Sequence, residues 1–478
     1  MSQAAALSDS FVGYDERWAI FEHPIQDISM RRVHTEYYYP INSDYGKNGI
    51  IQFNLNNASG RYLDINSTKI HLTCNITGKN GEIVRPPLFE HKSKSRRNVD
   101  GSEKGDDGQS DSEKNNQIIR EVLAPVNNFM GSLFSRCDVH FNGRAVTKAD
   151  HCYAYISYIK NLMYSSDAEQ NTTLQSELFF KDDLSTSGTH TNWQTSDNPS
   201  LELRGKLASN SKDFEVSGKI HSDIMGISRY IPSGVNVSIQ MFQNPAEFCL
   251  ISPNNRQGDF KVNIKKASIS IRMIEPAPVI SLSHEKLLDT NFAKFPYIKY
   301  DLKKHVMSAG IYNYVACNSF NDIIPFELLI FLISDSSASG KLDENPYLCR
   351  HTSLSHLSVT VDGNEFVNSP LNMTFAKDDS TNSSYAEAFE TLSGVNGSDN
   401  GTPITYEQFQ DGYAIYRFLL DNNHYDNGNV SQLPLSRTGN LKISLRFDEA
   451  LQKPTTLMVL GRFGGMLKID KTRNVVDV

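Results

Sequence analysis

The sequence predicts an all-β protein made of two antiparallel β domains in tandem. Three observations support this prediction: short segments alternate apolar and polar residues, two segments carry the dipeptides of tight hairpins, and patterns of the first half recur in the second. A chain of 478 residues is long enough for two or three domains. Apolar residues make up 39% and charged residues 21%, which is typical of a folded protein.

Alternating segments occur along the whole chain. A period of two places the apolar side chains on one face of a β-strand. Little helical pattern separates these segments, so we expect antiparallel sandwiches or barrels and not a parallel βαβ sheet. The predicted strands lie at residues 51–55, 68–76, 235–242, 260–274 and 441–447.

Two segments carry hairpin signals. The octapeptide VHFNGRAV contains Asn142-Gly143 between strand-like flanks, and VTVDGNEFV contains Asp362-Gly363 in the same position. A two-residue type I′ turn needs positive φ at both central residues, which Asn, Asp and Gly tolerate. Each segment therefore predicts a tight β-hairpin.

The same hairpins indicate an internal repeat. Gly143 and Gly363 lie 220 residues apart. A second correspondence follows in the same order, because SGVNVSIQMF alternates like TGNLKISLRF when Val235 is set against Leu441, an offset of 206. Neither match has weight alone, but two matches at a similar offset predict that one β domain occurs twice.

One segment interrupts the β pattern. Apolar residues at helical spacing predict a helix over residues 150–165 with Asp150 as its N-cap, followed by a shorter helix over residues 173–179. Two prolines within residues 275–283 mark the expected joint between the halves. Polar stretches predict three long surface loops, at residues 93–116, 181–200 and 377–402.

Charge and hydropathy exclude several classes of protein. The net charge of −8 gives no basic footprint for a dedicated nucleic-acid-binding module. The longest apolar run, residues 323–334, is interrupted by Pro325 and Glu327 and is shorter than the ~20 residues that span a membrane, so we expect no membrane span. No secretory signal is recognised at the N-terminus. We therefore expect a reducing compartment, with the six scattered cysteines free and mostly buried.

No segment carries a convincing catalytic or metal-binding pattern. Cys349 and His351 are close in sequence, but a nucleophile and its base must face each other in space. Adding His356 gives three candidate ligands, one fewer than a structural zinc site normally needs. We therefore expect no enzymatic activity, no cofactor and no metal. A small basic group could touch nucleic acid or act as a localisation signal, although a solvated surface explains it equally; its members are Lys92, Lys94, Arg96 and Arg97.

Longer motifs add a resemblance to a known family. A block near the middle of the first half contains Ala124, Pro125, Val126, Asn127, Asn128, Phe129, Ser132, Leu133, Phe134, Ser135, Asp138, Val139, Asn142 and Gly143, followed by Tyr153, Tyr155, Leu178, Phe179, Lys181 and Asp182. The C-terminal part contains Gly412-Tyr413, Phe418, GNL at 439–441, LRF at 445–447, EAL at 449–451, Ile469-Asp470-Lys471 and Arg473-Asn474-Val475. These motifs resemble those of the major capsid proteins of Polinton (Maverick) elements and adintoviruses.

That resemblance implies a double jelly-roll, which is two tandem eight-stranded antiparallel jelly rolls with a few short helices and long surface loops. It also implies a hexon-like major capsid protein, whose trimers have a pseudo-hexagonal outline and tile an icosahedral virion shell. The chain would then divide into an N-terminal arm at 1–30, a first jelly roll at 31–278 (with the charged loop 93–116 and the polar loop 181–200) and a second at 279–478 (with the polar loop 377–402).

The resemblance also implies partners and structural positions. The partners are further copies of the same chain and minor or penton capsid proteins, without direct nucleic-acid contact. Synthesis in the host cytoplasm would be followed by assembly in the nucleus. A minor or vertex capsid protein and a non-viral glycan-binding β-sandwich remain as alternatives. The motif positions expected to be structural are Pro125, Asn127, Asn128, Phe134, Asp138, Asn142, Gly143, Asp362, Gly363, Arg446, Asp470, Arg473 and Asn474.

Overall fold

The computed structural model describes most of the chain. The predicted charged loop 93–116 lies outside the described residues, as do residues 1–28 of the predicted N-terminal arm and parts of the other two predicted loops. The described residues are 29–42, 49–57, 60–87, 118–183, 191–195, 197–365, 370–375, 383–393, 402–421 and 433–477.

Strands dominate the described part of the chain. The first half contains β1 (Met30–Tyr38), β2 (Ile50–Leu55), β3 (Tyr62–Gly78), β4 (Ile83–Arg85), β5 (Ile118–Arg120), β6 (Ala124–Pro125), β7 (Phe134–Phe141), β8 (Arg144–Ala145), β9 (Phe214–Lys219), β10 (Val237–Gln243), β11 (Leu250–Ile251) and β12 (Phe260–Pro276). The second half contains β13 (Ala293–Met307), β14 (Asn313–Cys317), β15 (Ile323–Ile324), β16 (Glu327–Ser334), β17 (Leu354–Val361), β18 (Asn364–Glu365), β19 (Leu371–Asn372), β20 (Ile415–Leu419), β21 (Arg437–Thr438), β22 (Leu441–Phe447), β23 (Thr455–Ile469) and β24 (Val475–Asp477).

Helices are short and lie mostly between strands of different sheets. The first half contains α2 (Phe129–Ser132), α3 (Tyr153–Met163), α4 (Asp167–Gln170), η2 (Thr173–Glu177), α5 (Pro199–Ala208), η3 (Ser209–Ser211), η4 (Asp223–Gly226) and α6 (Ala246–Cys249). Between the halves and in the second half lie α7 (Pro278–Leu288), α8 (Asp335–Ala338), α9 (Ala386–Glu390) and α10 (Tyr406–Asp411).

Both halves have the same strand order. When the eight main strands of each half are numbered in chain order, their two antiparallel sheets read 1-8-3-6 and 2-7-4-5. In the first half these sheets are β1-β12-β3-β9 and β2-β10-β7-β8. In the second half they are β13-β23-β16-β20 and β14-β22-β17-β18. The fold is therefore a double jelly-roll, as the resemblance to capsid proteins implied.

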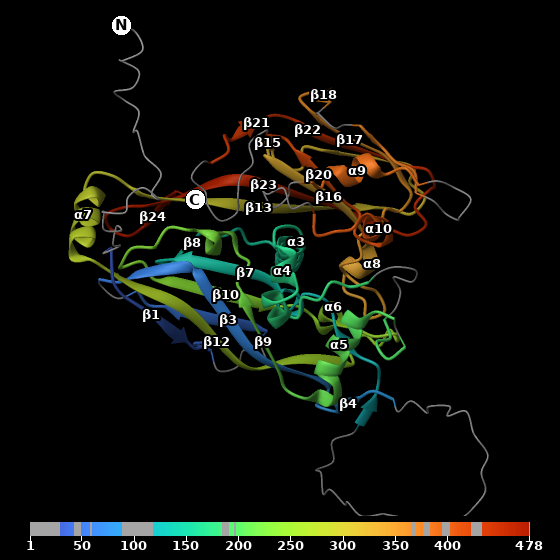
Figure 1. Ribbon diagram of the computed structural model, residues 1–478, viewed down its shortest axis with the longest axis horizontal. Helices are drawn as coiled ribbons and strands as arrows, with labels where there is room; N and C mark the ends of the chain where they lie inside the picture. The colour runs from blue at the N-terminus through green and yellow to red at the C-terminus, as the bar shows by residue number, and fades with distance from the viewer. Residues whose placement is uncertain are drawn as a thin grey trace, which may run out of the picture.

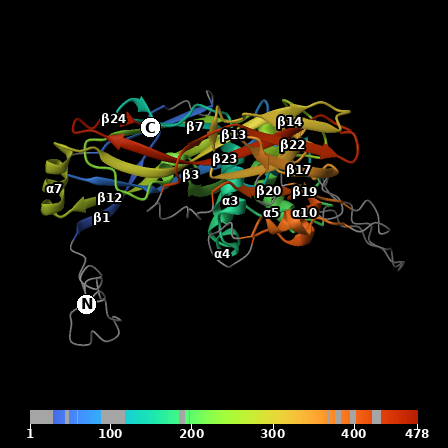
Figure 2. The ribbon, with the colours of Figure 1, turned by 90° about the horizontal axis from the view of Figure 1, so that it is seen from above.

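The two halves lie side by side with their long strands along the long axis of the molecule (Figure 1). Helix α7 links them at one end, and α3 lies between them. Figure 2 shows the same arrangement from above, with α7 again at one extremity. The first-half core includes residues of both of its sheets and reaches Phe295 and Tyr297 of β13. The apolar residues of α3 belong chiefly to the core cluster of the second half, so this helix joins the two halves.

Both predicted hairpins are confirmed. Strands β7 and β8 are joined by Asn142 and Gly143, with φ of 47° and 83°, and β17 and β18 by Asp362 and Gly363, with φ of 52° and 82°. No atom lies within 4 Å of a Cβ built on either glycine, so the positive φ and not crowding accounts for glycine there.

The predicted repeat is confirmed, but its register was wrong for one strand. Val237 faces Phe141 at the end of β7, and Leu441 faces Val361 at the end of β17. Leu441 therefore corresponds to Val237 and not to Val235, and the offset is 204 residues. An alternating pattern looks the same after a shift of two residues, so it identifies a strand without fixing its register.

The predicted helix exists but starts later than expected. It begins at Tyr153 with Cys152 in the N-cap position, and Asp150 does not cap it. The Asp150 carboxylate instead accepts a hydrogen bond from the backbone of Cys152, ahead of the helix. The shorter predicted helix is a 3-10 turn, η2, preceded by α4.

Two predicted loops and the predicted joint contain helices. The 181–200 stretch ends inside α5, where Asn198 accepts hydrogen bonds from the backbone of Ser200 and Leu201 and proline follows at the first helical position. The 377–402 stretch contains α9. At the predicted joint, Pro278 begins α7 and does not open a loop.

Candidate functional site: the interface between the two jelly rolls

Helix α3 is buried on nearly every side. Lys160 is its only residue that is not buried. The Lys160 ammonium donates to Asp223 Oδ1 at 3.1 Å and to the His221 carbonyl at 3.0 Å, and it lies 4.1 Å from the ring centre of Tyr300 on β13. Burial lowers the pKa of Lys160, and the Asp223 carboxylate opposes that shift. Lys160 is therefore paired within the first half, and its ammonium contacts the second half through the ring of Tyr300.

The predicted Asn pair anchors α3. Asn128 has a left-handed conformation, with φ of 51°. Its amide donates to Ser157 Oγ at 3.1 Å, and its amide oxygen accepts from Asn161 Nδ2 at 3.0 Å. The Asn127 Oδ1 accepts from the backbone N–H of Phe180 at 2.8 Å. Both amides are buried and hydrogen-bonded, so they fix the chain path rather than offer a free site.

Tyr347 of the second half inserts into the first. Its ring stacks on Tyr158 of α3 with centroids 4.1 Å apart and packs edge-on against Tyr155. Its hydroxyl lies 2.5 Å from Ser132 Oγ, next to the Asn128 turn. Burial raises the pKa of Tyr347, so the hydroxyl stays neutral. Sequence analysis missed this residue because no local pattern distinguishes it.

A buried ion pair within the first half also lies at the interface. Arg204 of α5 donates to Asp182 Oδ1 at 2.7 Å and to the Pro125 carbonyl at 3.0 Å, and its side chain is 2% exposed. Tyr413 of the second half donates to the Asp182 carbonyl at 2.7 Å. Two of the family-motif segments, around Asp182 and Tyr413, therefore meet across the interface.

The first hairpin meets the C-terminal turn. Asn142 Nδ2 donates to the Arg473 carbonyl at 2.8 Å, and Arg144 donates to the Val475 carbonyl. The Arg473 side chain also contacts the first half, because its Nε donates to the Ser233 carbonyl at 2.9 Å. Asp470 closes the turn by accepting from the Asn474 backbone N–H at 2.8 Å.

The remaining predicted positions lie apart from the contact between the first hairpin and the C-terminal turn. Phe134 is fully buried and faces Tyr153 edge-on. Asp138 lies on β7 and accepts from Arg136 Nε at 2.7 Å. Arg446 lies on β22, and Asp362 with Gly363 forms the second hairpin, which caps β22 of its own half.

A charged cluster supports the second half next to α3. Glu327 on β16 accepts from Arg417 Nε at 2.6 Å and from Arg462. The Arg462 guanidinium lies 4.3 Å from the ring centre of Tyr164, at the end of α3, and Tyr164 donates to Glu327 at 3.2 Å. Burial by itself would raise the pKa of Glu327, but the two arginines outweigh it and lower the pKa.

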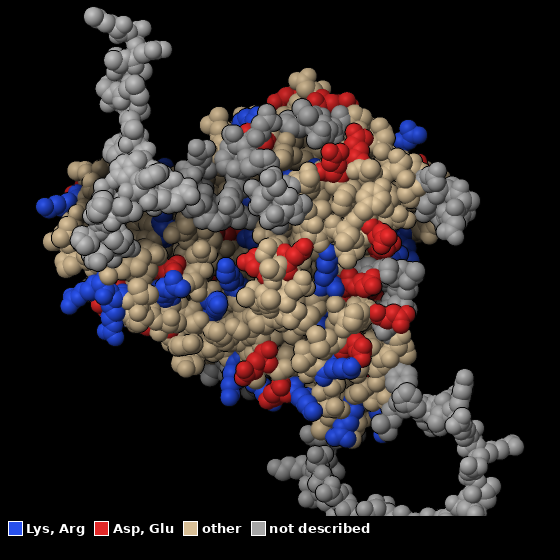
Figure 3. All heavy atoms as spheres, in the orientation of Figure 1, with Lys and Arg blue, Asp and Glu red and all other residues tan. Residues whose placement is uncertain are grey.

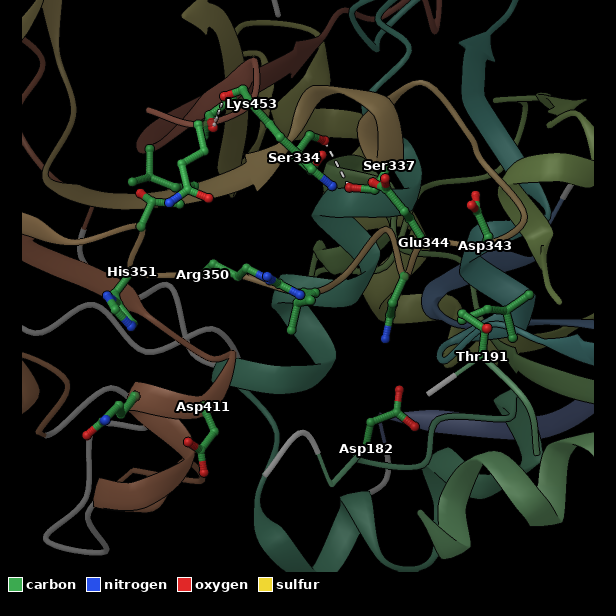
Figure 4. Close-up of a pocket in the computed structure, with 18 of the residues that line it drawn as sticks. Asp182, Thr191, Ser334, Ser337, Asp343, Glu344, Arg350, His351, Asp411 and Lys453 are labelled. Atoms are coloured by element: carbon green, nitrogen blue, oxygen red, sulfur yellow. Dashed lines mark hydrogen bonds between the residues drawn. The ribbon is translucent and has the colours of Figure 1, made fainter. Parts of the chain in front are cut away.

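A cavity of about 770 Å³ lies between the halves (Figure 4). The first half contributes Asp182 and Thr191, and the second contributes Glu344, Arg350 and Asp411. Acidic and basic side chains are mixed around it. Within the described part of the chain, no group of three or more His, Cys, Asp and Glu side chains is arranged to hold a metal ion.

Burial disfavours the charged forms of both Cys349 and His351. Burial raises the pKa of the Cys349 thiol to about 12, which keeps it protonated at neutral pH. His351 stacks on Phe375 with centroids 3.9 Å apart, and burial lowers its pKa to about 4.

Among the residues that the structure describes, no helix is long and apolar enough to cross a membrane.

The strand order of its two halves gives the chain the double jelly-roll fold. No protein-family model matches the sequence. An uncharacterized protein of Caenorhabditis elegans is 23% identical over 438 residues, which cover 89% of this chain and 93% of the relative.

Solved structures of viral proteins share the fold. A chain of the Sputnik virophage structure superposes with a TM-score of 0.58 and 12% identity, covering 98% of this chain and 93% of that one. The Faustovirus major capsid protein gives a TM-score of 0.52 and 9% identity, covering 98% and 94%. PBCV-1 VP54, fitted into a reconstruction of the virophage Sputnik, gives 0.53 and 9%, covering 96% and 99%.

Proposed function

We propose that this chain is a major capsid protein whose trimers tile an icosahedral virion shell. The observation that carries the proposal is the presence of two jelly rolls with the same strand order in one chain. Three such chains supply six similar units, which can form a pseudo-hexagonal ring. The Faustovirus major capsid protein, which shares the fold, supports the same role.

The contact between the halves supports a ring. It places α3 and the β7-β8 hairpin of the first jelly roll against β13 and the C-terminal turn of the second. Lys148, next to the hairpin, pairs with Asp301 of β13 at 3.0 Å. This contact joins two different surfaces, so the opposite surface of each half stays available. Repeating a contact of this head-to-tail type closes a ring when the rotation per unit fits.

Apolar side chains on the two available surfaces support the same arrangement. On the first half, Tyr37 and Tyr39 are 61% and 72% exposed at and beyond the end of β1. On the second half, Tyr312 and Val315 are exposed at and before β14. In our proposal, β1 and its neighbours in one copy meet the β14-β22-β17-β18 sheet of the next copy.

The proposal also covers the family, the partners, the place of assembly and the division of the chain. We assign the chain to the Polinton and adintovirus capsid proteins on its sequence motifs, with minor or penton capsid proteins as further partners. Synthesis would take place in the host cytoplasm and assembly in the host nucleus. The chain would divide at residues 278 and 279, which lie in α7 between the last strand of one sheet set and the first of the other.

Light scattering behind a sizing column tests the trimer. We expect three times the mass of one chain, and hexagonal outlines in negative-stain images of the same peak. A monomer that persists at high concentration would contradict an autonomous trimer and favour a binding module.

Substitution at the proposed contact makes the test specific. We expect Tyr37→Asp to dissociate the trimer, because it places a charge in an apolar contact. Leu207→Asp on α5 is the matched control, since Leu207 is also exposed but lies on another element. Equal masses for the Tyr37 variant and wild type would contradict the proposed surface.

A further inference from the structure

Helix α7 presents apolar side chains to the surface. Leu288 is its only buried residue, whereas Val279, Leu282 and Leu287 are 74%, 63% and 58% exposed. An isolated helix of this length is marginal in water, and most helical stability in proteins comes from packing of an apolar face. The apolar surface of α7 is therefore incompletely packed, and of these three exposed residues Leu287 lies at a cavity.

An apolar cavity of about 740 Å³ lies beside α7. Its volume is within the range of about 300–1,000 Å³ that is typical of ligand pockets. The apolar groups that line it come from α7, from the turn after it and from both jelly rolls; they include Tyr62, Tyr230, Ile280, Leu287, Phe292 and Phe295. Two cationic residues, Arg229 and Lys294, also line it.

The described chain begins at this cavity. Ser29 and Met30 are part of its lining, and the Ser29 carbonyl accepts a hydrogen bond from the Ala277 backbone N–H at 2.8 Å, just ahead of α7. Ser29, the first described residue, is therefore held at the cavity. Figure 3 shows Lys and Arg side chains at the same end of the molecule, where Figure 1 draws α7.

The preceding 28 residues have a complementary composition. They contain five carboxylates, at Asp9, Asp15, Glu16, Glu22 and Asp27, against one arginine, Arg17. They also contain the apolar run Trp18-Ala19-Ile20-Phe21. Apolar groups suit the cavity, and the carboxylates suit its cationic rim.

We propose that residues 1–28 of the chain bind the cavity beside α7 of the same chain, with the Trp18–Phe21 run as the apolar anchor. Trp18 is 11 residues from Ser29, so an extended chain could reach as far as about 36 Å. A short tether raises the effective concentration to the millimolar range, which favours the chain's own segment over one from another copy. This inference does not depend on a capsid function.

Tryptophan fluorescence of the full chain tests the proposal. The sequence has two tryptophans, Trp18 and the buried Trp193. In a Trp193→Phe variant, we expect Trp18 emission to be blue-shifted relative to free tryptophan and weakly quenched by acrylamide. Emission and quenching like those of free tryptophan would overturn the proposal. If Trp193→Phe does not fold, the difference between the wild-type and Trp18→Phe spectra gives the same readout.

A variant of the cavity makes the readout specific. We expect Leu287→Asp, in the Trp193→Phe background, to shift Trp18 emission to the red and to increase quenching severalfold. Leu435→Asp is the matched control, because Leu435 is 79% exposed and does not line the cavity. Identical spectra for the two variants would overturn the site. Protection of Trp18 that disappears on dilution would overturn the assignment to the same chain and indicate a neighbouring copy.

Discussion

At the scale of single residues, buried polar groups hold the two halves in one arrangement. Glu327 between its two arginines and Tyr347 against α3 are the clearest cases. Both side chains would be costly to leave without partners, because a buried polar group that loses its hydrogen bond pays its desolvation cost. Each one therefore penalises alternative packings.

We expect Glu327→Gln to destabilise the fold by about 3–5 kcal/mol, because it leaves Arg417 and Arg462 buried without their counter-charge. Urea unfolding measures this difference. Glu202→Gln is the matched control, since Glu202 forms an exposed pair with Lys206 that is worth only about 0.5 kcal/mol. A loss below about 1 kcal/mol in the Glu327 variant would contradict the role of the cluster.

The pH dependence of stability follows from the same cluster. Because the pKa of Glu327 is lowered in the folded protein, its carboxylate stabilises the fold above the ordinary glutamate pKa of about 4.3. This stabilisation is lost as the pH falls through the lowered pKa. We expect the free energy of unfolding to fall more steeply in acid for wild type than for Glu327→Gln. Parallel acid titrations of the two proteins would contradict this assignment.

Two substitutions of Tyr347 distinguish the stability that comes from its hydrogen bond from the stability that comes from its packing. We expect Tyr347→Phe to cost about 1 kcal/mol through loss of the Ser132 contact, and Tyr347→Ala to cost about 3–5 kcal/mol through the cavity that it leaves. Chemical denaturation of the two variants gives both values. Similar losses for the two would show that ring packing at the interface carries little stability.

At the scale of elements, the two hairpins show how one motif acquires two roles. Both tips bind their own jelly roll in the same way: Asn142 accepts from the Asn236 backbone, and Asp362 accepts from the Asn440 backbone. The first tip also donates to the Arg473 carbonyl, which a carboxylate cannot do. The amide at position 142 therefore adds a contact between the halves.

This difference predicts unequal effects of matched substitutions. We expect Asn142→Asp to cost about 1 kcal/mol, because it removes the donor to Arg473 and keeps the acceptor for Asn236. Asp362→Asn keeps the acceptor for Asn440 and should be nearly neutral. Thermal unfolding of both variants checks this expectation, and equal changes in the two would contradict it.

At the scale of the whole molecule, the reactivity of the cysteine thiols is a measure of how well both jelly rolls are packed. Cys317 is exposed, whereas the other five are buried and free. Burial raises the pKa of all five buried thiols, which further slows their reaction.

We therefore expect a maleimide to modify one thiol per chain in the native protein and all six after unfolding. Mass spectrometry counts the modified thiols, and Cys317→Ser should remove the fast reaction. Rapid modification of several thiols in the native protein would contradict the packing of both jelly rolls.

Local sequence patterns were sufficient for both hairpins and for the five predicted alternating strands, but not for strands such as β16, whose buried residues form a continuous run. Alternation identifies a strand because its side chains point to opposite faces, and Asn142-Gly143 identifies a turn because few residues accept positive φ. The same patterns could not fix the register between the repeats or the start of α3. A two-residue shift preserves an alternating pattern. The Asp150 carboxylate accepts a hydrogen bond from the backbone of Cys152 before the helix begins, so it does not cap the helix.

The sequence by itself determined the β class, the tandem repeat and both hairpins, because these depend on the period of burial and on backbone conformations at single positions. Only the tertiary structure decided which distant segments meet: Tyr347 with α3, Tyr413 with Asp182, and Asn142 with the C-terminal turn. Such contacts join residues more than 180 positions apart. They depend on how two completed sheets pack, and no local pattern records that choice.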